Sequence, residues 1–288
     1  MRIALFLQQP SPEAGPRINP VTEEVIGRLR RRGARVDLLV AEEHVFDLAD
    51  LRPSHDLYVL KSKSPLTLSV AAVLAAAGAS VVNSVAACAL TRDKIAVTAG
   101  VSAAGVPVPP SWATAEPARL GPLAATGPLW LKPLAGSKGH GVRRVAEPAD
   151  LGSERVRWNA IGQPLPLFVQ REMPGTGTDL KVYVVGERAW AVAKAWPTRT
   201  DAEKTGMPAA LPAPVREAAL RSGEALGLEV YGVDFLVTGE QFWAVDVNAF
   251  PGSRGVPELP RCLADYLYTR ARRGPEQARP TAPFEAVA

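Results

Sequence analysis

The sequence predicts an α/β protein of two or three modest domains. Of its 288 residues, 47% are hydrophobic and 22% are charged, a composition typical of ordinary globular chains and unlike collagen, coiled coils or disordered proteins. Segments with strand and helix signals alternate over the first ninety residues. Such alternation favours a parallel, doubly wound sheet at the N-terminus.

The first expected strand is Ile3–Leu7, a run of apolar residues directly after Met1 and Arg2. This run is too short for a secretory signal and lacks a cleavage-type ending, so we expect a cytoplasmic protein. The other elements expected in this region are a helix from about Thr22 to Gly33, strands over 35–40, 57–60 and 80–82, and a helix over 66–77. Gly78 stands where a helix C-cap before a strand belongs, which favours a buried helix over a membrane span.

Charge and cysteine content exclude several classes of protein. The chain has 33 Lys and Arg against 29 Asp and Glu, and an excess of +4 over this length is too slight to indicate a nucleic-acid partner. The two cysteines, Cys88 and Cys262, stand in apolar segments. They therefore suggest neither a disulfide framework nor a cysteine-based zinc site, as expected in a reducing compartment.

A second region begins near residue 90, where we place a domain boundary. A helix is expected from Thr91, its candidate N-cap, and it leads into the stiff, proline-rich segment 106–110. Further along, two short strands within 129–145 flank a glycine-rich turn, two more within 167–195 flank 174–177, and a helix over 215–226 precedes strands over 230–237 and 242–247. From Gly274 the chain is rich in Pro and Ala without periodicity, which predicts a disordered tail.

The glycine-rich turn is the first motif with a chemical implication. Its lysines and glycines, with one hydroxyl, are Lys132, Gly136, Ser137, Lys138, Gly139 and Gly141. A flexible loop of this kind can fold its backbone N–H groups over phosphates, although a plain hairpin would also account for it. The Walker A spacing, which ends in Gly-Lys-Ser/Thr before a helix, is absent, so a standard P-loop is excluded.

Oxygen-bearing side chains mark the last two expected strands. Asp234 stands on one strand, and Asp246 and Asn248 stand on the next, about a dozen residues later. Adjacent antiparallel strands would bring the three together, and the period of two points Asp246 and Asn248 the same way. Such hard oxygen ligands suit Mg²⁺, whose octahedron substrate phosphates complete. Alternatively, Asp246 and Asn248 cap the turn before Pro251.

Together with Arg92-Asp93-Lys94 and Val169-Gln170-Arg171-Glu172, these motifs resemble the ATP-grasp superfamily from about residue 80 to 270. The resemblance implies an ATP-grasp fold behind an N-terminal pre-ATP-grasp domain. The implied parts are 1–90 (pre-ATP-grasp), 91–166 (central subdomain with a glycine-rich phosphate lid), 167–273 (C-terminal subdomain with the metal site) and the tail 274–288. The implied cofactors are ATP and Mg²⁺, with Mn²⁺ as an alternative metal.

The resemblance also implies roles for individual residues. Lys94 and Lys132 would contact ATP phosphates, together with the turn residues Gly136, Ser137, Lys138 and Gly139. The strand that ends in Gln170, Arg171, Glu172 and Met173 would hold the adenine through its backbone, and Asp179 would lie by the ribose. The metal ligands would be Asp234, Asp246 and Asn248.

Two branches of the superfamily match in part. Val82-Asn83, Lys138-Gly139-x-Gly141-Val142 and Asp179-Leu180-Lys181 look like the RimK-type amino-acid ligases. The sequence departs from the usual pattern of these ligases at three points. Asp246 stands where they usually carry Glu, Lys181 stands where they usually carry Arg, and no Arg-x-Asn…Gly-Gly segment follows Lys194. Lys132-Pro133-Leu134 and the run from Asp246 to Gly252 are instead similar to the ATP-grasp inositol phosphate kinases, whose Lys and His positions map onto Lys61, Lys181 and His140.

The reaction class that we prefer from the sequence is a carboxylate–amine ligase acting through an acyl phosphate on a small molecule or peptide. A small-molecule kinase is the alternative, because positioning and charge neutralisation of the γ-phosphoryl group serve either acceptor. A non-catalytic nucleotide-binding module is a third class, which the retained Lys94, Lys132 and metal set argue against. Lys181 and Arg254 are the candidate catalytic cations, although Arg254 could be an exposed loop residue.

Lys61, Lys63 and His140 are the candidate substrate residues. Lys61 and Lys63 follow the expected strand 57–60 at its carboxyl end, where open α/β sheets bind ligands. Surface positions would account for all three equally. We expect neither a nucleic-acid nor a membrane partner, and a homo-oligomer remains open.

Overall fold

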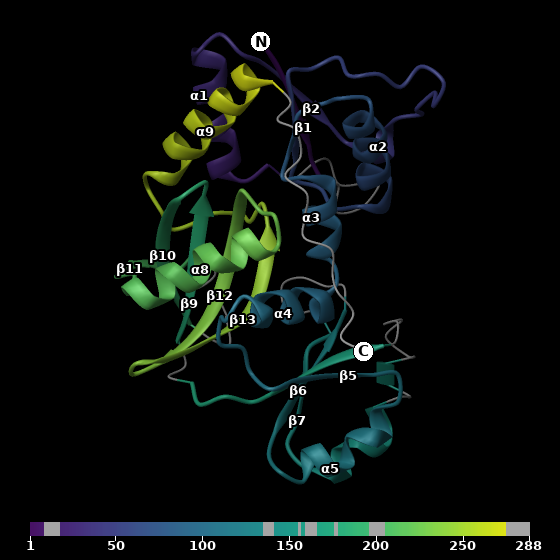
Figure 1. The fold of residues 1–288 in the computed structure, drawn as a ribbon, viewed down its shortest axis with the longest axis vertical. Helices are drawn as coiled ribbons and strands as arrows, with labels where there is room; N and C mark the ends of the chain where they lie inside the picture. The colour runs from purple at the N-terminus through teal and green to yellow at the C-terminus, as the bar shows by residue number, and fades with distance from the viewer. Residues whose placement is uncertain are drawn as a thin grey trace. The chain divides into compact units, whose positions relative to one another are not determined.

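The computed structural model describes residues 1–8, 18–134, 141–154, 157–158, 166–175, 178–195 and 205–274. The chain forms two compact units (Figure 1). The first contains residues 1–88 and 227–230 together with the segment that starts at Pro257, and the second contains residues 89–226 and 231–256.

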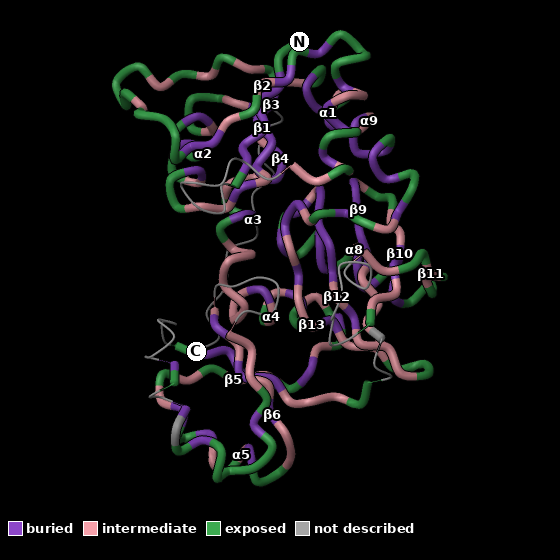
Figure 2. The backbone as a smooth tube through the Cα atoms, turned by 180° about the vertical axis from the view of Figure 1, so that it is seen from behind, coloured by how far each residue is buried: buried purple, intermediate pink, exposed green. Residues whose placement is uncertain are grey.

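The first unit is built on a four-stranded parallel sheet in the order β2-β1-β3-β4. Its strands are β1 (Arg2–Phe6), β2 (Arg35–Leu39), β3 (Leu57–Leu60) and β4 (Val81–Val82). Its helices are α1 (Pro20–Arg31), the 3₁₀ helix η1 (Ala41–Glu43), α2 (Pro65–Ala76) and α9 (Leu259–Arg273), and α3 (Val85–Leu90) runs across the boundary at residue 88. Helices α1 and α9 lie on one side of the sheet and α2 on the other, so the predicted doubly wound arrangement is confirmed (Figures 1 and 2).

Local capping explains where the helices of this unit begin. The Asn19 side chain accepts a hydrogen bond from the Thr22 backbone N–H at 2.9 Å, and Pro20 occupies the first helical turn of α1. Ser64 and Pro65 play the same parts for α2. The basic residues of α1 stand in its last turn, where cations complement the helix dipole.

Helix α9 belongs to the first unit, although the predicted boundary placed residues up to 273 in the C-terminal subdomain. It packs against α1 and forms the Arg32–Asp265 ion pair with the residue that caps that helix. Glu229 also contacts α9, because its carboxylate accepts a 2.5 Å hydrogen bond from Tyr266 and lies 3.0 Å from Arg270. The predicted tail beyond residue 274 lies outside the described residues.

Asn83 fixes the 227–230 segment to this unit. It is fully buried, its side-chain oxygen accepts from the backbone N–H groups of Glu229 and Val230 at 2.8 Å each, and its amide donates to the Val230 carbonyl at 2.7 Å. A buried side chain that satisfies three backbone groups orders the chain strongly.

The second unit contains two antiparallel sheets. The smaller sheet has the order β5-β8-β6-β7, with strands β5 (Ser111–Thr114), β6 (Leu129–Pro133), β7 (Arg143–Val145) and β8 (Leu167–Arg171). It encloses a core that includes Leu129, Leu131 and Trp158. The helices beside it are η2 (Pro117–Leu120), α5 (Gly121–Ala124) and η3 (Pro148–Ser153). Strands β6 and β7 are the two strands predicted around the glycine-rich turn, whose residues 135–140 lie outside the described residues.

The larger sheet has the order β11-β10-β9-β12-β13. Its strands are β9 (Thr178–Val185), β10 (Arg188–Ala195), β11 (Met207–Ala209), β12 (Val230–Thr238) and β13 (Gln241–Ala249), accompanied by α4 (Lys94–Ala103) and α8 (Ala213–Ala225). The prediction of two strands within 167–195 was wrong, because the chain reverses at Gly186-Glu187 and forms three. Gly186 has φ +58°, which suits this tight hairpin, and the resulting register sets Lys194 opposite Asp179.

The two faces of the larger sheet differ in polarity. On one face, Val182 and Val184 of β9 are buried with Val233 of β12, and α8 packs against this side. Period-two alternation sends Asp179, Lys181 and Tyr183 to the opposite face. The candidate functional residues of the sheet therefore share that polar face.

None of the helices in the described part of the chain combines the length and the apolar character needed to cross a membrane.

Candidate functional site

The predicted metal ligands meet on the polar face of the larger sheet. Asp234 of β12 and Asp246 of β13 are directly opposed in the antiparallel register, and a β-bulge follows Asp234. Asn248 stands two residues beyond Asp246 on the same face, and its amide donates to Asp246 Oδ2 at 2.9 Å. The expectation that neighbouring strands bring these three side chains together is met.

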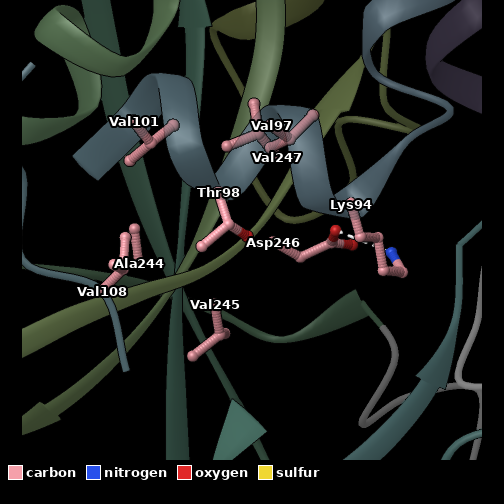
Figure 3. Close-up of a pocket in the computed structure, with 9 residues that line it drawn as sticks. All are labelled: Lys94, Val97, Thr98, Val101, Val108, Ala244, Val245, Asp246 and Val247. Carbon is pink, nitrogen blue, oxygen red and sulfur yellow. Dashed lines mark hydrogen bonds and ion pairs between the residues drawn. The ribbon is translucent and has the colours of Figure 1, made fainter. Parts of the chain in front are cut away.

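Two lysines neutralise these carboxylates. Lys181 Nζ donates to both oxygens of Asp234, at 2.6 and 2.7 Å. Lys94 Nζ donates to Asp246 Oδ1 at 2.9 Å (Figure 3). Burial alone would raise the pKa of Asp246, but Lys94, Lys132 and Lys181 hold that pKa below its usual value. Burial likewise opposes the charge of Lys181, yet its pKa is raised, with Asp234 as the largest favourable influence. The charged forms of Asp246 and Lys181 are therefore favoured by their partners in the site.

The donor set fits Mg²⁺. Within the described residues no group of three or more His, Cys, Asp or Glu side chains is placed to hold a metal, so the candidate set is two carboxylates with the Asn248 carboxamide oxygen. Mg²⁺ is commonly held by one or two carboxylates while substrate phosphates supply further oxygens. A metal bound here would supply positive charge to the phosphates of a nucleotide.

Lys132 reaches the same site from the smaller sheet. It lies on β6, and its Nζ donates to Gln170 Oε1 of the neighbouring strand β8, whose side chain is buried. Burial lowers the pKa of Lys132 to about 8, whereas the negative charge of Asp246 works in the opposite direction. Asp179 faces the same cluster, and burial together with the charge of Asp234 raises its pKa to about 6. Anionic phosphates beside Lys132 would further favour its charged form.

The side chains of Arg171 and Glu172 contact residues in and beside the smaller sheet. The Arg171 guanidinium donates to the Gly127 and Leu123 carbonyls and lies 5.4 Å from the Trp112 ring centroid. Glu172 forms a bidentate pair with Arg144 at 2.8 and 2.7 Å. A contribution of Arg171, Glu172 and the following Met173 to nucleotide binding would therefore use the backbone, as the resemblance implies.

Helix α4 positions Lys94. Its N-cap is Asp93, whose Oδ1 accepts from the Ile95 and Ala96 backbone N–H groups at 2.8 and 3.2 Å, so the expectation that Thr91 caps this helix was wrong. Lys94 is the first residue of the helix. A pocket runs between α4 and β13, with the Lys94–Asp246 pair at one end and mostly apolar side chains along the rest, Val97 and Val247 among them (Figure 3).

The loop after β13 has a strained backbone. Phe250 and Ser253 have φ values of +44° and +52°, and Gly255 has +84°. Positive φ is costly for residues with a side chain and is frequent at functional sites. The Arg254 side chain is exposed, whereas its backbone N–H lies close enough to the Tyr183 hydroxyl to act against the rise in the pKa of that phenol. The structure thus shows a structural contact for Arg254, and its proposed catalytic role stays a prediction.

Sequence reasoning missed Tyr183 and Lys194. Tyr183 is buried on the polar face of β9, and Lys194 Nζ of β10 lies 3.2 Å from its hydroxyl oxygen. Burial and the neighbouring cation Lys181 lower the pKa of Lys194 to about 8. The Gly186-Glu187 turn was the signal that could have found the pair, because a two-residue hairpin there fixes which residues of β9 and β10 face each other.

The remaining candidates lie elsewhere in the chain or outside the described residues. Lys61 and Lys63 belong to the first unit and follow β3, as predicted. Lys61 is partly buried, and this burial lowers its pKa to about 8. Gly136, Ser137, Lys138, Gly139 and His140 lie outside the described residues, so their roles stay predictions.

Comparisons with solved structures identify the fold. The RimK domain ATP-grasp protein of Sphaerobacter thermophilus has a TM-score of 0.74 at 22% identity, covering 93% of this chain and 99% of that one. An ATP-grasp ligase complexed with a precursor variant, Mg and ADP has a TM-score of 0.69 at 21% identity, covering 93% and 98%. The D-alanine–D-alanine ligase of Bacillus anthracis, complexed with ATP, gives 0.69 at 17% identity, covering 95% and 98%. The chain has the ATP-grasp fold.

Comparisons with known sequences show which proteins this chain resembles most consistently. A probable α-L-glutamate ligase of Thioalkalivibrio sulfidiphilus is 30% identical over 189 residues, which cover 61% of this chain and 61% of that protein. Another, of Shewanella loihica, is 25% identical over 236 residues and 78% of its length. The inositol-tetrakisphosphate 1-kinase of Xenopus laevis is 37% identical over only 57 residues, 19% of this chain. No family model matches the sequence. The resemblance to RimK-type ligases is confirmed.

Proposed function

We propose that this protein is an ATP- and Mg²⁺-dependent ligase that joins a carboxylate to an amine. The observation that carries the proposal is the convergence of three lysines on two opposed carboxylates, formed by Lys94, Lys132 and Lys181 with Asp234 and Asp246. Such a cluster suits a triphosphate with its metal, since phosphoryl transfer depends mainly on positioning and charge neutralisation. The ligase relatives support the carboxylate and the amine as the two acceptors.

The chemistry balances in two steps. A carboxylate oxygen attacks the γ-phosphorus of ATP and ADP leaves, which gives an acyl phosphate. The amine nitrogen then attacks the acyl carbon, inorganic phosphate leaves, and the nitrogen loses a proton to give the amide. Lys132 and Lys181 would hold the transferred phosphoryl group, and Lys94 would orient the nucleotide phosphates.

L-Glutamate is the substrate that we propose to test first, because the relatives are named as glutamate ligases. Mass spectrometry should find amide-linked glutamate together with ADP, and not AMP. When hydroxylamine replaces the amine, the hydroxamate of the acid should accumulate. Asp246→Asn should abolish both products, whereas Asp265→Asn, which removes a carboxylate of α9 in the other unit, should leave them unchanged.

The kinase alternative has a specific observation in its favour, the 57-residue match to an inositol phosphate kinase. The same assay separates the two reactions. Transfer of labelled γ-phosphate to a hydroxyl of an inositol phosphate, with no hydroxamate from any acid, would contradict the ligase proposal.

A further inference from the structure

A second polar cluster lies on the same sheet face, beyond the pairs that involve the metal ligands. Tyr183 is its centre: Lys181 Nζ lies 6.0 Å and Lys194 Nζ lies 5.7 Å from the centroid of the Tyr183 ring. Both distances are within the range of cation–π attraction. The cluster therefore begins directly beside the lysine that pairs with Asp234.

Two donors face the Tyr183 hydroxyl. Lys194 Nζ donates to it at 3.2 Å, and the backbone N–H of Arg254 lies beside it and acts against the rise in its pKa. Burial raises the pKa of Tyr183, so the phenol keeps its proton at neutral pH and can itself donate to a third group. An acceptor placed beside this hydroxyl would meet a phenol O–H and an ammonium.

The charges of this cluster favour an anion. Lys94 and Lys181 are paired with carboxylates, whereas the hydrogen-bond partner of Lys194 here is a neutral hydroxyl. Burial and the positive charges of Lys181 and Arg254 lower the pKa of Lys194, whereas the negative charge of Asp234 acts in the opposite direction. A bound carboxylate would relieve that repulsion and would accept hydrogen bonds from charged donors, which are stronger than neutral ones.

The surrounding backbone is built closely around Lys194. Gly206 has φ +73°, and a Cβ there would lie 2.8 Å from Lys194 Cγ and 2.6 Å from the Ala193 carbonyl oxygen. Gly255, in the strained loop, would place a Cβ 2.7 Å from the Thr205 carbonyl oxygen. A residue with a Cβ would clash at both positions, so the chain packs closely beside Lys194 only because these two residues are glycines.

Resting on the proposed ligase function, we propose that Lys194 and the Tyr183 hydroxyl bind the carboxylate of the acid substrate, the group that receives the γ-phosphoryl. Its position next to Lys181 suits this role, because Lys181 is expected at the γ-phosphate and the attacking oxygen must lie within about 3.5 Å of the phosphorus. Lys181 and Lys194 would then hold the two reacting groups on either side of Tyr183.

The test measures hydroxamate formation from L-glutamate, ATP and hydroxylamine, with the KM for L-glutamate and for ATP determined separately. Lys194→Met keeps the apolar stem and removes the charge. We expect it to raise the KM for glutamate at least about tenfold, the effect of losing a charge-assisted hydrogen bond, while the KM for ATP changes less than about twofold. Lys194→Arg should recover most of the affinity, and Tyr183→Phe should raise the same KM by about three- to tenfold.

The matched control is Arg188→Met, which removes a cation at the other end of β10, where it stacks on Trp190 and is exposed. It should leave both KM values unchanged.

If Lys194→Met raises the KM for ATP and not for glutamate, or changes neither, the assignment of the carboxylate site is wrong although the ligase function stands. If wild-type protein forms no hydroxamate from glutamate, the ligase function fails as proposed for this substrate, and the carboxylate site falls with it. Circular dichroism of each variant separates misfolding from lost binding. If Lys194→Arg folds but has the same KM for glutamate as Lys194→Met, the proposed role of the charge is also refuted.

Discussion

The Lys181–Asp234 pair allows a quantitative test of how the site is held together without nucleotide. Lys181 Nζ contacts both oxygens of Asp234 at 2.6 and 2.7 Å, and the side chains of the two residues are 13% and 24% exposed. Breaking a fully buried pair from one side costs about 3–5 kcal/mol, because the other charge is left uncompensated. The partial exposure here lowers our expectation to about 2–3 kcal/mol for Lys181→Met or Asp234→Asn alone.

The double variant should be less destabilised than the sum of the two single variants. Once both charges are gone, no uncompensated charge remains, so we expect a coupling free energy of at least about 1.5 kcal/mol. The measurement is urea unfolding of the wild type, both single variants and the double variant, in EDTA and without nucleotide, so that ligands do not contribute.

An exposed ion pair provides the control for this cycle. Arg28 and Glu24 lie on α1, 2.7 Å apart, with side chains 35% and 43% exposed. The same cycle there should give a coupling of about 0.5 kcal/mol or less. Additive effects at Lys181 and Asp234, within about 0.5 kcal/mol, would show that the pair does not form in solution and would refute the reasoning.

Three other predictions concern the metal, the phosphates and acid stability. Asp246→Ala and Asn248→Ala should each lower kcat at least about a hundredfold at saturating Mg-ATP while keeping native circular dichroism, and near-wild-type turnover in both would remove the metal assignment. Lys94→Met and Lys132→Met should weaken ATP binding by about tenfold or more in calorimetry, and unchanged affinity in both would contradict the phosphate role. Hydrogen bonds from Arg2, Arg35 and His55 hold the pKa of Asp37 far below its usual value. Its contribution to stability is therefore complete above the unfolded pKa of about 3.9 and is lost as the pH falls toward the folded value. The difference in urea midpoint between wild type and Asp37→Asn should shrink from pH 6 to pH 2.5, and a constant difference would exclude this linkage.

The sequence predicted the parts of the fold that depend on local pattern. Alternating apolar segments are sufficient for the parallel sheet of the first unit, and the spacing between Asp234 and Asp246 is sufficient to place both on neighbouring strands. Contacts between distant segments could not be predicted in this way. The three hydrogen bonds between Asn83 and residues 229–230, and the packing of α9 on α1, depend on tertiary structure that no local periodicity encodes.

The candidate site shows the same division. Lys94 and Lys132 were found because they stand in motifs that resemble a family. Lys194 was missed because a single long strand was expected where the chain forms a hairpin, and a lysine in a strand of unknown register has no predictable neighbour. Had the turn at Gly186-Glu187 been predicted, the expected site would have included the cluster around Tyr183.

The lysine–carboxylate pairs of the ligand-free site have a thermodynamic consequence. As long as Lys94 and Lys181 are bonded to Asp246 and Asp234, the lysines that we propose for phosphates and the carboxylates that we propose for a cation neutralise one another. A nucleotide that bound without a cation would pair with the two lysines and leave the two carboxylates without a positive partner. A cation that bound alone would leave the two ammonium groups without a negative partner. When nucleotide and cation bind together, every charged group exchanges one partner for another and none is left unpaired. The protein should therefore bind nucleotide and metal with positive cooperativity, each strengthening the affinity for the other by the same factor.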